Sequence, residues 1–342
     1  MKKIYVATGG VLIILLFVAL FFFMHGTAKG PNKSSSFTNN STHFNLPASV
    51  KEASLTDSSL RFLDINTGNF AVINVSTGQQ QEYGPYLIDS QKVTWSPDGK
   101  SAVAISGEDE SVSVIQIDKN SQVTNSAAGV GNITNSFGVI VPLNNQVHTP
   151  DWSSDSKQLL YQFINSNSGK STITVANADG SNWQSIVDAP TVFSSLWWSP
   201  IGTYAIGLNT TTNPSQYDIV AISSKTIKKL ITGGNDLRWS PSGKLALLDS
   251  TDGSALIIAD VTNGSTTSVA VPAQVRQFAW LDETHLVGVS NGKFITIDLA
   301  TKQSKAFGDA GQLNEFAQVL GIYKDTLFYT QDGAVLSVPI TK

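Results

Sequence analysis

The chain has 342 residues, of which 41% are hydrophobic and only 14% charged, with a formal net charge of −4 and no cysteine. The absence of cysteine excludes disulfides, thiolate metal sites and lipid attachment at a cysteine. Arginine occurs only at Arg61, Arg238 and Arg276, so the chain lacks the clustered positive charge that a nucleic-acid partner requires. Low charge and abundant Ser, Thr, Asn and Gly suit a β-rich extracytoplasmic domain.

The N-terminus predicts a membrane anchor. After a cytoplasmic tip, residues 1–3, an apolar run covers residues 4–24. As a helix rising ~1.5 Å per residue it would span the ~30 Å hydrocarbon core. Lys2 and Lys3 predict a cytoplasmic N-terminus and an extracytoplasmic bulk, and hence a single-pass protein of the cell membrane. The alternative is a signal peptide whose cleavage leaves a secreted protein, but the run exceeds the usual ~7–15-residue core of such peptides.

Residues 25–42 are predicted to form a disordered tether. They are rich in Gly, Ser, Asn and Thr and contain almost no apolar side chain. This composition gives a flexible linker, which would hold the following domain, residues 43–342, away from the membrane.

A repeat organises that domain. It begins with a tryptophan and reads WSPDGK, WSSDSK, WSPIGT, WSPSGK and WLDETH at Trp95, Trp152, Trp198, Trp239 and Trp280. The interval from Trp198 to Trp239 is 41 residues, and so is the interval from Trp239 to Trp280. The same interval and the similarity of the flanking sequences add units at Ser54 and Gly321, which makes seven units, near residues 54, 95, 152, 198, 239, 280 and 321.

Each unit is predicted to form four strands. Strand A ends at the tryptophan, as in residues 276–280, and the SPDG segment supplies the Pro and Gly of a tight turn. Strands B and C follow, as in residues 244–249 and 256–260, and Asp-Gly or Asn-Gly turns join them. Strand D is polar, as in residues 266–271.

This period of about 40–45 residues with several short strands is typical of propeller blades. The fold class is therefore predicted to be all-β, a seven-bladed β-propeller preceded by one transmembrane helix. Six or eight blades are the alternative, because the second unit carries a long insertion in residues 120–147. Residues 137–143 are the candidate for its displaced strand D.

The last unit ends before a strand D, which would leave an unpaired edge beside the closure of the ring. We expect residues 43–48 to pair there as the missing outer strand. The alternative is a three-stranded last blade.

WSPDGK followed by an apolar strand resembles the TolB-type, WD-repeat-like propeller repeats of bacterial proteins. The resemblance covers about residue 43 to the end, and Trp95 begins a motif that matches without change. The unit at Trp152 lacks the Pro and Gly, the unit at Trp198 has Ile201 in place of Asp, and the first, sixth and seventh units keep little of the motif. The resemblance implies a periplasmic or extracellular platform that binds peptides or proteins. TolB proteins also carry an additional N-terminal globular domain, for which the tether leaves no space.

Polar residues precede each tryptophan. Because strand A is innermost in a propeller, its first residues would face the mouth of the central channel. We predict a ring of binding residues there: Lys92, His148, Thr149, Ser195, Asn235, Asp236, Arg276, Gln277 and Gln318. The alternative is that these residues are polar only because a water-filled channel is lined by polar side chains.

The search for catalytic chemistry gives no motif. There is no GxSxG elbow and no HExxH, and the histidines His25, His43, His148 and His285 lie in different units, so no catalytic residue, metal or cofactor is predicted. Residues 64–68 are interpreted as a hairpin turn rather than a calcium loop.

Several aromatic residues lie outside the tryptophan register, among them Trp183, Trp197 and Tyr83. Packing between blades is the main interpretation of these residues, and contact with a glycan or a protein is the alternative.

Three functions follow. The favoured one is a membrane-tethered extracytoplasmic propeller that binds a protein, a peptide or a component of the cell envelope and is not an enzyme. The first alternative is a propeller hydrolase or lyase that acts on a sugar or lactone at the channel, with His148, Asp236, Arg276 and Glu315 around it. The second is a structural spacer without a site.

Overall fold

The computed structural model describes residues 44–46, 50–56, 58–84, 90–107, 110–117, 140–250, 254–271, 276–290, 293–307, 318–331 and 334–340. All of them belong to one compact unit, Ser41–Lys342. The predicted anchor and tether, residues 4–42, and most of the predicted insertion lie outside the described residues. In the part of the chain that is described, no helix has the length and apolarity needed to cross a membrane.

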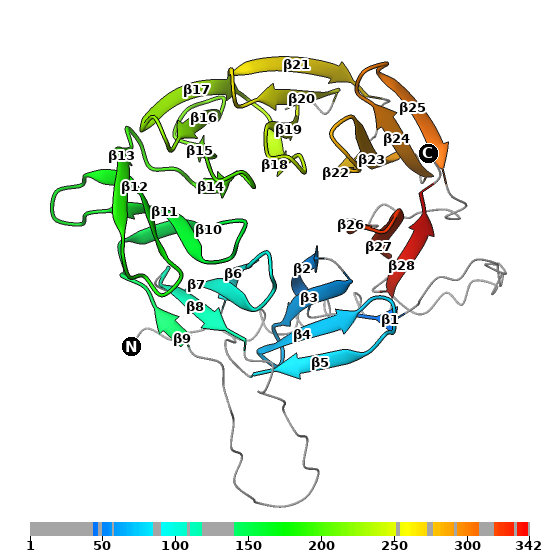
Figure 1. The fold of residues 1–342 in the computed structure, drawn as a ribbon, viewed down its shortest axis with the longest axis horizontal. Helices are drawn as coiled ribbons and strands as arrows, with labels where there is room; N and C mark the ends of the chain where they lie inside the picture. Colours follow the sequence, from blue (N-terminus) through cyan, green and yellow to red (C-terminus); the bar gives the residue numbers. More distant parts are fainter. Residues whose placement is uncertain are drawn as a thin grey trace, which may run out of the picture. The chain divides into compact units, whose positions relative to one another are not determined.

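The described strands form seven antiparallel sheets of four strands each, arranged as blades around a ring (Figure 1). The innermost strands are β2 (Val50–Thr56), β6 (Ser90–Trp95), β10 (Val147–Trp152), β14 (Ser195–Trp198), β18 (Asn235–Trp239), β22 (Arg276–Trp280) and β26 (Gln318–Tyr323). Next to them lie β3 (Ser59–Asp64), β7 (Ser101–Ser106), β11 (Gln158–Ile164), β15 (Tyr204–Asn209), β19 (Leu245–Asp249), β23 (His285–Ser290) and β27 (Thr326–Gln331).

The third strands are β4 (Asn69–Asn74), β8 (Val112–Gln116), β12 (Ser171–Asn177), β16 (Gln216–Ala221), β20 (Ala255–Asp260), β24 (Lys293–Asp298) and β28 (Ala334–Pro339). The outermost are β5 (Gln80–Tyr83), β9 (Ile140–Pro142), β13 (Gln184–Asp188), β17 (Thr226–Thr232), β21 (Ser265–Ala270), β25 (Gln303–Phe307) and β1 (Phe44–Asn45). We number the blades 1 to 7 from the one that begins with β2. The seven-bladed, all-β prediction is confirmed.

The last blade takes its outer strand from the other end of the propeller. β1 pairs antiparallel with β28, so that Phe44 lies opposite Val335 and Asn45 opposite Ala334. The sheet order is β1-β28-β27-β26, which confirms the predicted closure by the segment after the tether. The ring is therefore closed by residues that are far apart in the sequence.

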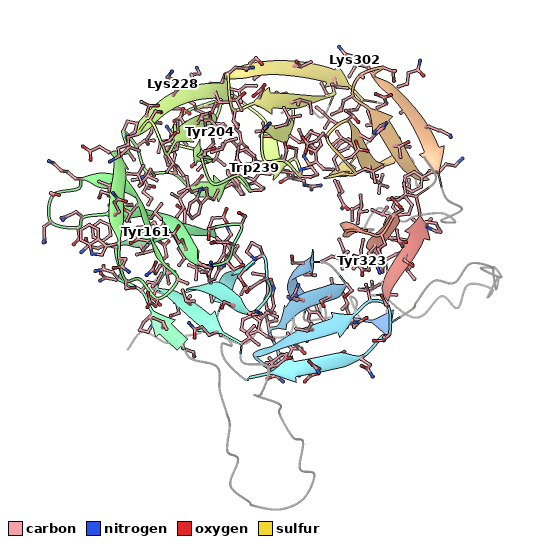
Figure 2. The ribbon with its side chains drawn as sticks, in the orientation of Figure 1. Tyr161, Tyr204, Lys228, Trp239, Lys302 and Tyr323 are labelled. Atoms are coloured by element: carbon pink, nitrogen blue, oxygen red, sulfur yellow. The ribbon has the colours of Figure 1, made fainter. Side chains whose placement is uncertain are left out.

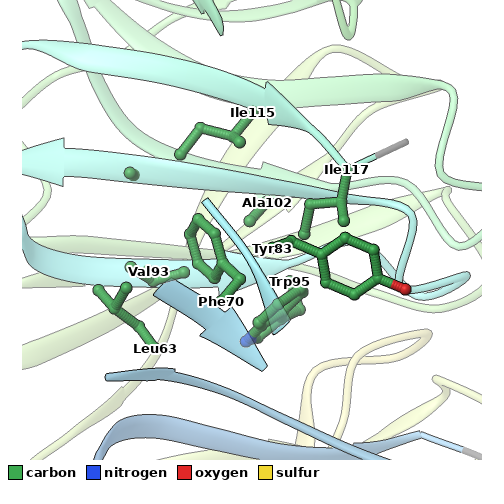
Figure 3. Close-up of a cluster of buried hydrophobic side chains, with 9 residues drawn as sticks. Leu63, Phe70, Tyr83, Val93, Trp95, Ala102, Ile115 and Ile117 are labelled. Atoms are coloured by element: carbon green, nitrogen blue, oxygen red, sulfur yellow. The ribbon is translucent and has the colours of Figure 1, made fainter. Parts of the chain in front are cut away.

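Each hydrophobic cluster in the described residues lies between two blades. In the cluster of Figure 3, Leu63 and Phe70 of blade 1 pack against Val93, Trp95 and Ala102 of blade 2. The rings of Phe70 and Trp95 meet edge to face, with centroids 5.0 Å apart and planes at 76°. Such a pair adds about 0.5–1.5 kcal/mol to the free energy of burial.

The motif turn is held by its own side chains. Ser96 Oγ donates a hydrogen bond to Asp98 Oδ1 (2.8 Å) and accepts one from the backbone N–H of Ser101 (3.0 Å). Asp98 Oδ1 also accepts from the N–H of Lys100 (3.0 Å), and Gly99 has a φ of 65°. The Ser, Asp and Gly of the repeat therefore shape the turn that follows the inner strand.

Where the motif departs from WSPDGK, the departing residue often contacts the next blade. Ser156, which replaces the Gly of blade 3 and has a φ of 63°, accepts a hydrogen bond from the N–H of Asp98 in blade 2 (2.9 Å). In blade 4, by contrast, Ser199 keeps the Ser of the motif, and its Oγ donates to the carbonyl of Gly243 in blade 5 (2.6 Å). In blade 6, the carboxylate of Glu283 accepts from the N–H and the hydroxyl of Ser242 in blade 5.

Gly99 allows a test of how closely the motif turn of blade 2 packs against blade 1. A Cβ at Gly99 would lie 1.9 Å from Nε of Arg61 in blade 1, and φ is 65°, whereas Gly78 has a φ of 70° and open space around a Cβ. We expect Gly78→Ala to lower the free energy of unfolding by about 1–2 kcal/mol through the backbone alone. Gly99→Ala should lower it by about 2–4 kcal/mol, because Arg61 must also move.

Urea denaturation of the two variants measures the difference between these free energies. Equal losses would show that the contact between Arg61 and Gly99 does not hold blades 1 and 2 together.

Candidate functional site

The inner strands share a bulge near their first residues. In blades 1, 3, 5 and 6, three steps along the inner strand oppose two steps along its neighbour, as between Asn235 and Arg238 or between Arg276 and Ala279, and in blades 2 and 7 two steps oppose one. The residue inside the bulge has a positive φ in three blades: Thr149 (47°), Asp236 (50°) and Gln277 (56°). Bulges of this kind redirect side chains at the rim of a sheet.

The bulge also determines which residues are equivalent to the tryptophans in blades 1 and 7, whose units have lost the tryptophan. Trp280 pairs with Leu286, and the corresponding pairs are Leu55 with Leu60 and Ile322 with Leu327. The tryptophan register in blades 1 and 7 therefore falls one residue after Ser54 and Gly321. In the same register, Gln318 corresponds to Arg276 and not to Gln277.

The predicted ring residues all lie at or near the starts of inner strands. Lys92 is exposed in β6, Ser195 is half-buried in β14, and His148 and Thr149 are half-buried in β10. Asn235, Arg276 and Gln318 lie in β18, β22 and β26, and their side chains are outside the described part. Whether these residues bind a ligand stays a prediction.

One of the predicted ring residues forms a hydrogen bond between two blades, and another is buried without a partner. Gln277 Oε1 accepts a hydrogen bond from the backbone N–H of Val319 (2.9 Å), which joins blade 6 to blade 7. Thr149 Oγ1 is buried and makes no hydrogen bond to a described residue. The ring therefore includes a residue that connects two blades and a residue whose buried hydroxyl has no hydrogen-bond partner among the described residues.

Charges of both signs gather at the inner strand of blade 5. Arg238 is half-buried, and burial lowers its pKa, while Asp236 and Asp249 oppose this shift. Burial raises the pKa of Asp249, and Arg238 acts against it. Burial, together with the charges of Asp236 and Asp249, raises the pKa of Tyr217 in blade 4 to about 12. Tyr217 therefore stays neutral, and its hydroxyl donates to the carbonyl of Gly234 (3.2 Å).

Asp151 forms the second charged position. Its Oδ1 accepts from the N–H of Trp152 (2.9 Å) and its Oδ2 from the N–H of Trp198 in the next blade (2.7 Å). Burial raises the pKa of Asp151 to about 6, although these two hydrogen bonds and the charge of Lys92 lower it. An ionised carboxylate thus joins blade 3 to blade 4 at neutral pH, next to the lysine of blade 2.

Sequence reasoning did not single out Asp151, Arg238 or Asp249. Asp151 and Arg238 each directly precede a tryptophan of the repeat. The equivalent position in blade 6 is the uncharged Ala279, and this difference in charge is the feature of the sequence that could have identified the two residues. Asp249 pairs with Asn235 across the first two strands of blade 5, so its proximity to Arg238 follows from the register.

The described residues do not assemble a catalytic constellation. His148 and Asp236 lie in different blades and share no hydrogen bond or ion pair. No group of three or more potential metal ligands occurs in the described residues. His285 instead contacts Asp282 through Nδ1 (2.9 Å) in the turn of blade 6.

The comparisons with known proteins bear on the fold. No family model matches the sequence, and no curated protein matches it. Among solved structures, the chain is similar to one from a mitotic checkpoint complex, at 14% identity and a TM-score of 0.59, over 92% of this chain and 96% of that one. It is also similar to a catalytically inactive virginiamycin B lyase from Staphylococcus aureus with quinupristin, at 12% identity and a TM-score of 0.59, over 88% and 99%. At these identities the likeness shows the fold alone: a β-propeller with WD-like repeats.

The position of Asp151 predicts a pH dependence of stability. Its folded pKa of about 6 lies above the value of 3.8 expected for an unfolded chain, so the folded state binds the proton more tightly. The contribution of this group to stability is therefore greatest below pH ~4 and declines as the pH rises to ~6, by about 3 kcal/mol in total.

Asp151→Asn removes this titration. Urea denaturation at pH 4 and pH 7 should show that the free energy of unfolding of the wild type, relative to the variant, falls by about 2 kcal/mol between the two values. Because the other carboxyl groups are common to both proteins, parallel pH profiles would contradict the raised pKa.

Proposed function

We propose that this protein is a membrane-tethered extracytoplasmic platform whose propeller binds a protein, a peptide or a component of the cell envelope at the ends of its inner strands. The observation that carries the proposal is the one-residue bulge near the start of the inner strand in six blades, which turns polar residues such as Thr149 and Asp236 out of the regular ladder. A rigid scaffold with variable residues at strand ends is a common basis for recognition.

The charges indicate the type of ligand. Arg238 makes no ion pair with a described residue, although Asp236 and Asp249 are close enough to influence its pKa. Lys92 and Asp151 supply a second pair of opposite charges on blades 2 and 3. A mixed set of charges favours a polar peptide segment with charges of its own, because complementary charges give specificity and fast association.

The TolB-type resemblance of the WSPDGK repeats supports this binding role from the sequence. The hydrolase or lyase alternative lacks a comparable observation, because His148 and Asp236, which it requires to act together, are not in contact. The spacer alternative gives no reason for a half-buried Arg238 without an ion-pair partner in the described part of the chain.

Localisation is part of the proposal. The apolar run of residues 4–24 would anchor the chain in the cell membrane with its N-terminus in the cytoplasm, and residues 25–42 would tether the propeller outside. The alternative is secretion after cleavage of the N-terminal segment.

Arg238 provides the test of the binding role. Peptides selected from a random displayed library on the full-length protein in detergent should bind Arg238→Gln about tenfold more weakly or worse than the wild type, because a hydrogen bond from a charged group is lost. Lys228→Gln is the matched control: it also removes one positive charge, but from the exposed outer strand β17 (Figure 2).

Isothermal titration calorimetry measures both affinities. The proposal fails if no peptide is enriched, or if Arg238→Gln and Lys228→Gln change the affinity equally.

The anchor has its own test. We expect the expressed protein to stay in the membrane fraction after extraction with alkaline carbonate, and mass spectrometry of that fraction to find residues 4–24 still attached. A soluble extracellular protein that lacks this segment would favour the secreted alternative.

A further inference from the structure

A cavity outside the inner strands forms a separate candidate site. It lies at the outer part of the boundary between blades 2 and 3, with a volume of about 520 Å³. Ligand pockets for small molecules usually occupy ~300–1,000 Å³. Leu143 and Asn144, which follow β9, the outer strand of blade 2, line the cavity together with residues of blade 3.

The floor of the cavity is one face of blade 3. Tyr161 lies opposite Thr174, Phe163 lies opposite Thr172, and Thr174 lies opposite Ser185, so these side chains are cross-strand neighbours on β11, β12 and β13. All of them line the cavity. The binding groups are therefore side chains on a sheet face, and not the open edge of a strand.

Aromatic groups dominate this floor. Trp183, in the turn before β13, is 67% exposed, the highest value of any large hydrophobic residue described. Packing between blades is the main interpretation of the aromatic residues outside the tryptophan register. Trp183 is too exposed to fit that interpretation. A flat, exposed indole at the edge of a cavity offers a stacking surface that the fold itself does not use.

Tyr161 supplies a polar group without a protein partner. The residue is only 6% exposed, and it lies on the second strand of blade 3 (Figure 2). Its hydroxyl makes no hydrogen bond with any residue that the structure describes, and it is not a fully buried atom, so it is open to the cavity that Tyr161 lines. Burial raises its pKa, so the hydroxyl stays protonated and can donate.

A line of hydroxyls crosses the same floor. Thr172 Oγ1 lies 3.2 Å from Thr174 Oγ1, and Ser185 Oγ donates to Thr172 Oγ1 at 3.5 Å. Each hydroxyl can donate one hydrogen bond and accept two, so the line has capacity left for a ligand. The amide groups of Asn144 and Asn165 also line the cavity.

Lys170 is the single charged residue among those that line the cavity. It is exposed and forms no ion pair within the described part of the chain. The lining therefore carries one net positive charge, which complements a ligand with one negative group.

We propose that this cavity binds an oligosaccharide that contains a carboxylated sugar. A sugar ring has an apolar face that can stack on Trp183 and a rim of hydroxyls that matches Tyr161, Thr172 and Ser185, and its carboxylate would meet Lys170. A peptide that binds by strand addition would instead need the open edge of a strand, whereas this lining is a sheet face. A lipid chain would leave the hydroxyl line without partners.

This site is independent of the inner-strand site, because it shares no residue with it. The propeller would hold a glycan at its outer side, whether or not a peptide binds at the inner strands. Arg238→Gln should therefore leave glycan binding unchanged.

The test is calorimetric titration of the full-length protein in detergent with three tetrasaccharides at up to ~1 mM: hyaluronan tetrasaccharide, which alternates an N-acetylated and a carboxylated sugar, and the neutral chitotetraose and cellotetraose. We expect the hyaluronan tetrasaccharide to bind most tightly. Trp183→Ala should weaken its binding about tenfold and Tyr161→Phe by a smaller factor. Lys170→Gln should weaken the acidic ligand and leave any neutral one unchanged.

Ile201→Ala is the matched control, because Ile201 is an exposed apolar residue, 40% accessible, on the turn of blade 4. Unchanged circular dichroism and melting temperature would show that the Trp183 and Tyr161 variants are folded. The proposal is overturned if no tetrasaccharide binds, if Trp183→Ala binds as the wild type does, or if the Trp183-dependent ligand is a displayed peptide.

Discussion

Each blade of this propeller has two apolar faces, and only the neighbouring blades can cover them. The hydrophobic clusters of the described residues reflect this constraint, because each one is shared by two adjacent blades and none is contained in a single sheet. The cluster of Leu60, Phe62, Phe328 and Val335 joins the first blade to the last. A ring with an uncovered face would expose this surface to water, so closure by β1 is a condition for the whole fold.

The turns after the inner strands add directional contacts to this packing. Ser96 and Asp98 hold their own turn, whereas Ser156, Ser199 and Glu283 reach the neighbouring blade. A residue that departs from the repeat is therefore not simply a loss of pattern. It gives one boundary between blades a contact that the others lack, which fixes the order of otherwise similar blades.

The two candidate binding surfaces follow from local exceptions to the same regular ring. At the inner strands, the bulges interrupt the ladder and place Asp236 and Thr149 in a left-handed conformation. At the outer side, a cavity lies against blade 3, and Tyr161 and Trp183 line it. Regular blades bury their side chains against each other, so binding groups become available only where the repeat is broken.

From the sequence, seven blades of four strands are the main prediction, with six or eight blades as the alternative, and residues 43–48 are the expected closing strand. Strand A of the sixth unit agrees with β22 at both ends, and the other strands given as examples agree to within one residue, because the 41-residue period, the alternating apolar residues and the turn residues all act locally. The closing strand was predictable because an unpaired edge in the last blade requires a partner.

The tryptophan register in blades 1 and 7, and the residues that make up the two candidate binding surfaces, follow from the tertiary structure alone. The bulge moves the tryptophan position to Leu55 and Ile322, and a bulge of one residue leaves no trace in the spacing of degenerate units. Asp249 and Arg238 become neighbours through strand pairing, and Asp151 meets Trp198 across a boundary between blades. Trp183 and Tyr161 of blade 3 line the same cavity as Leu143, which follows the outer strand of blade 2. These relations depend on contacts between units, whereas the repeat records only what each unit needs for its own strands and turns.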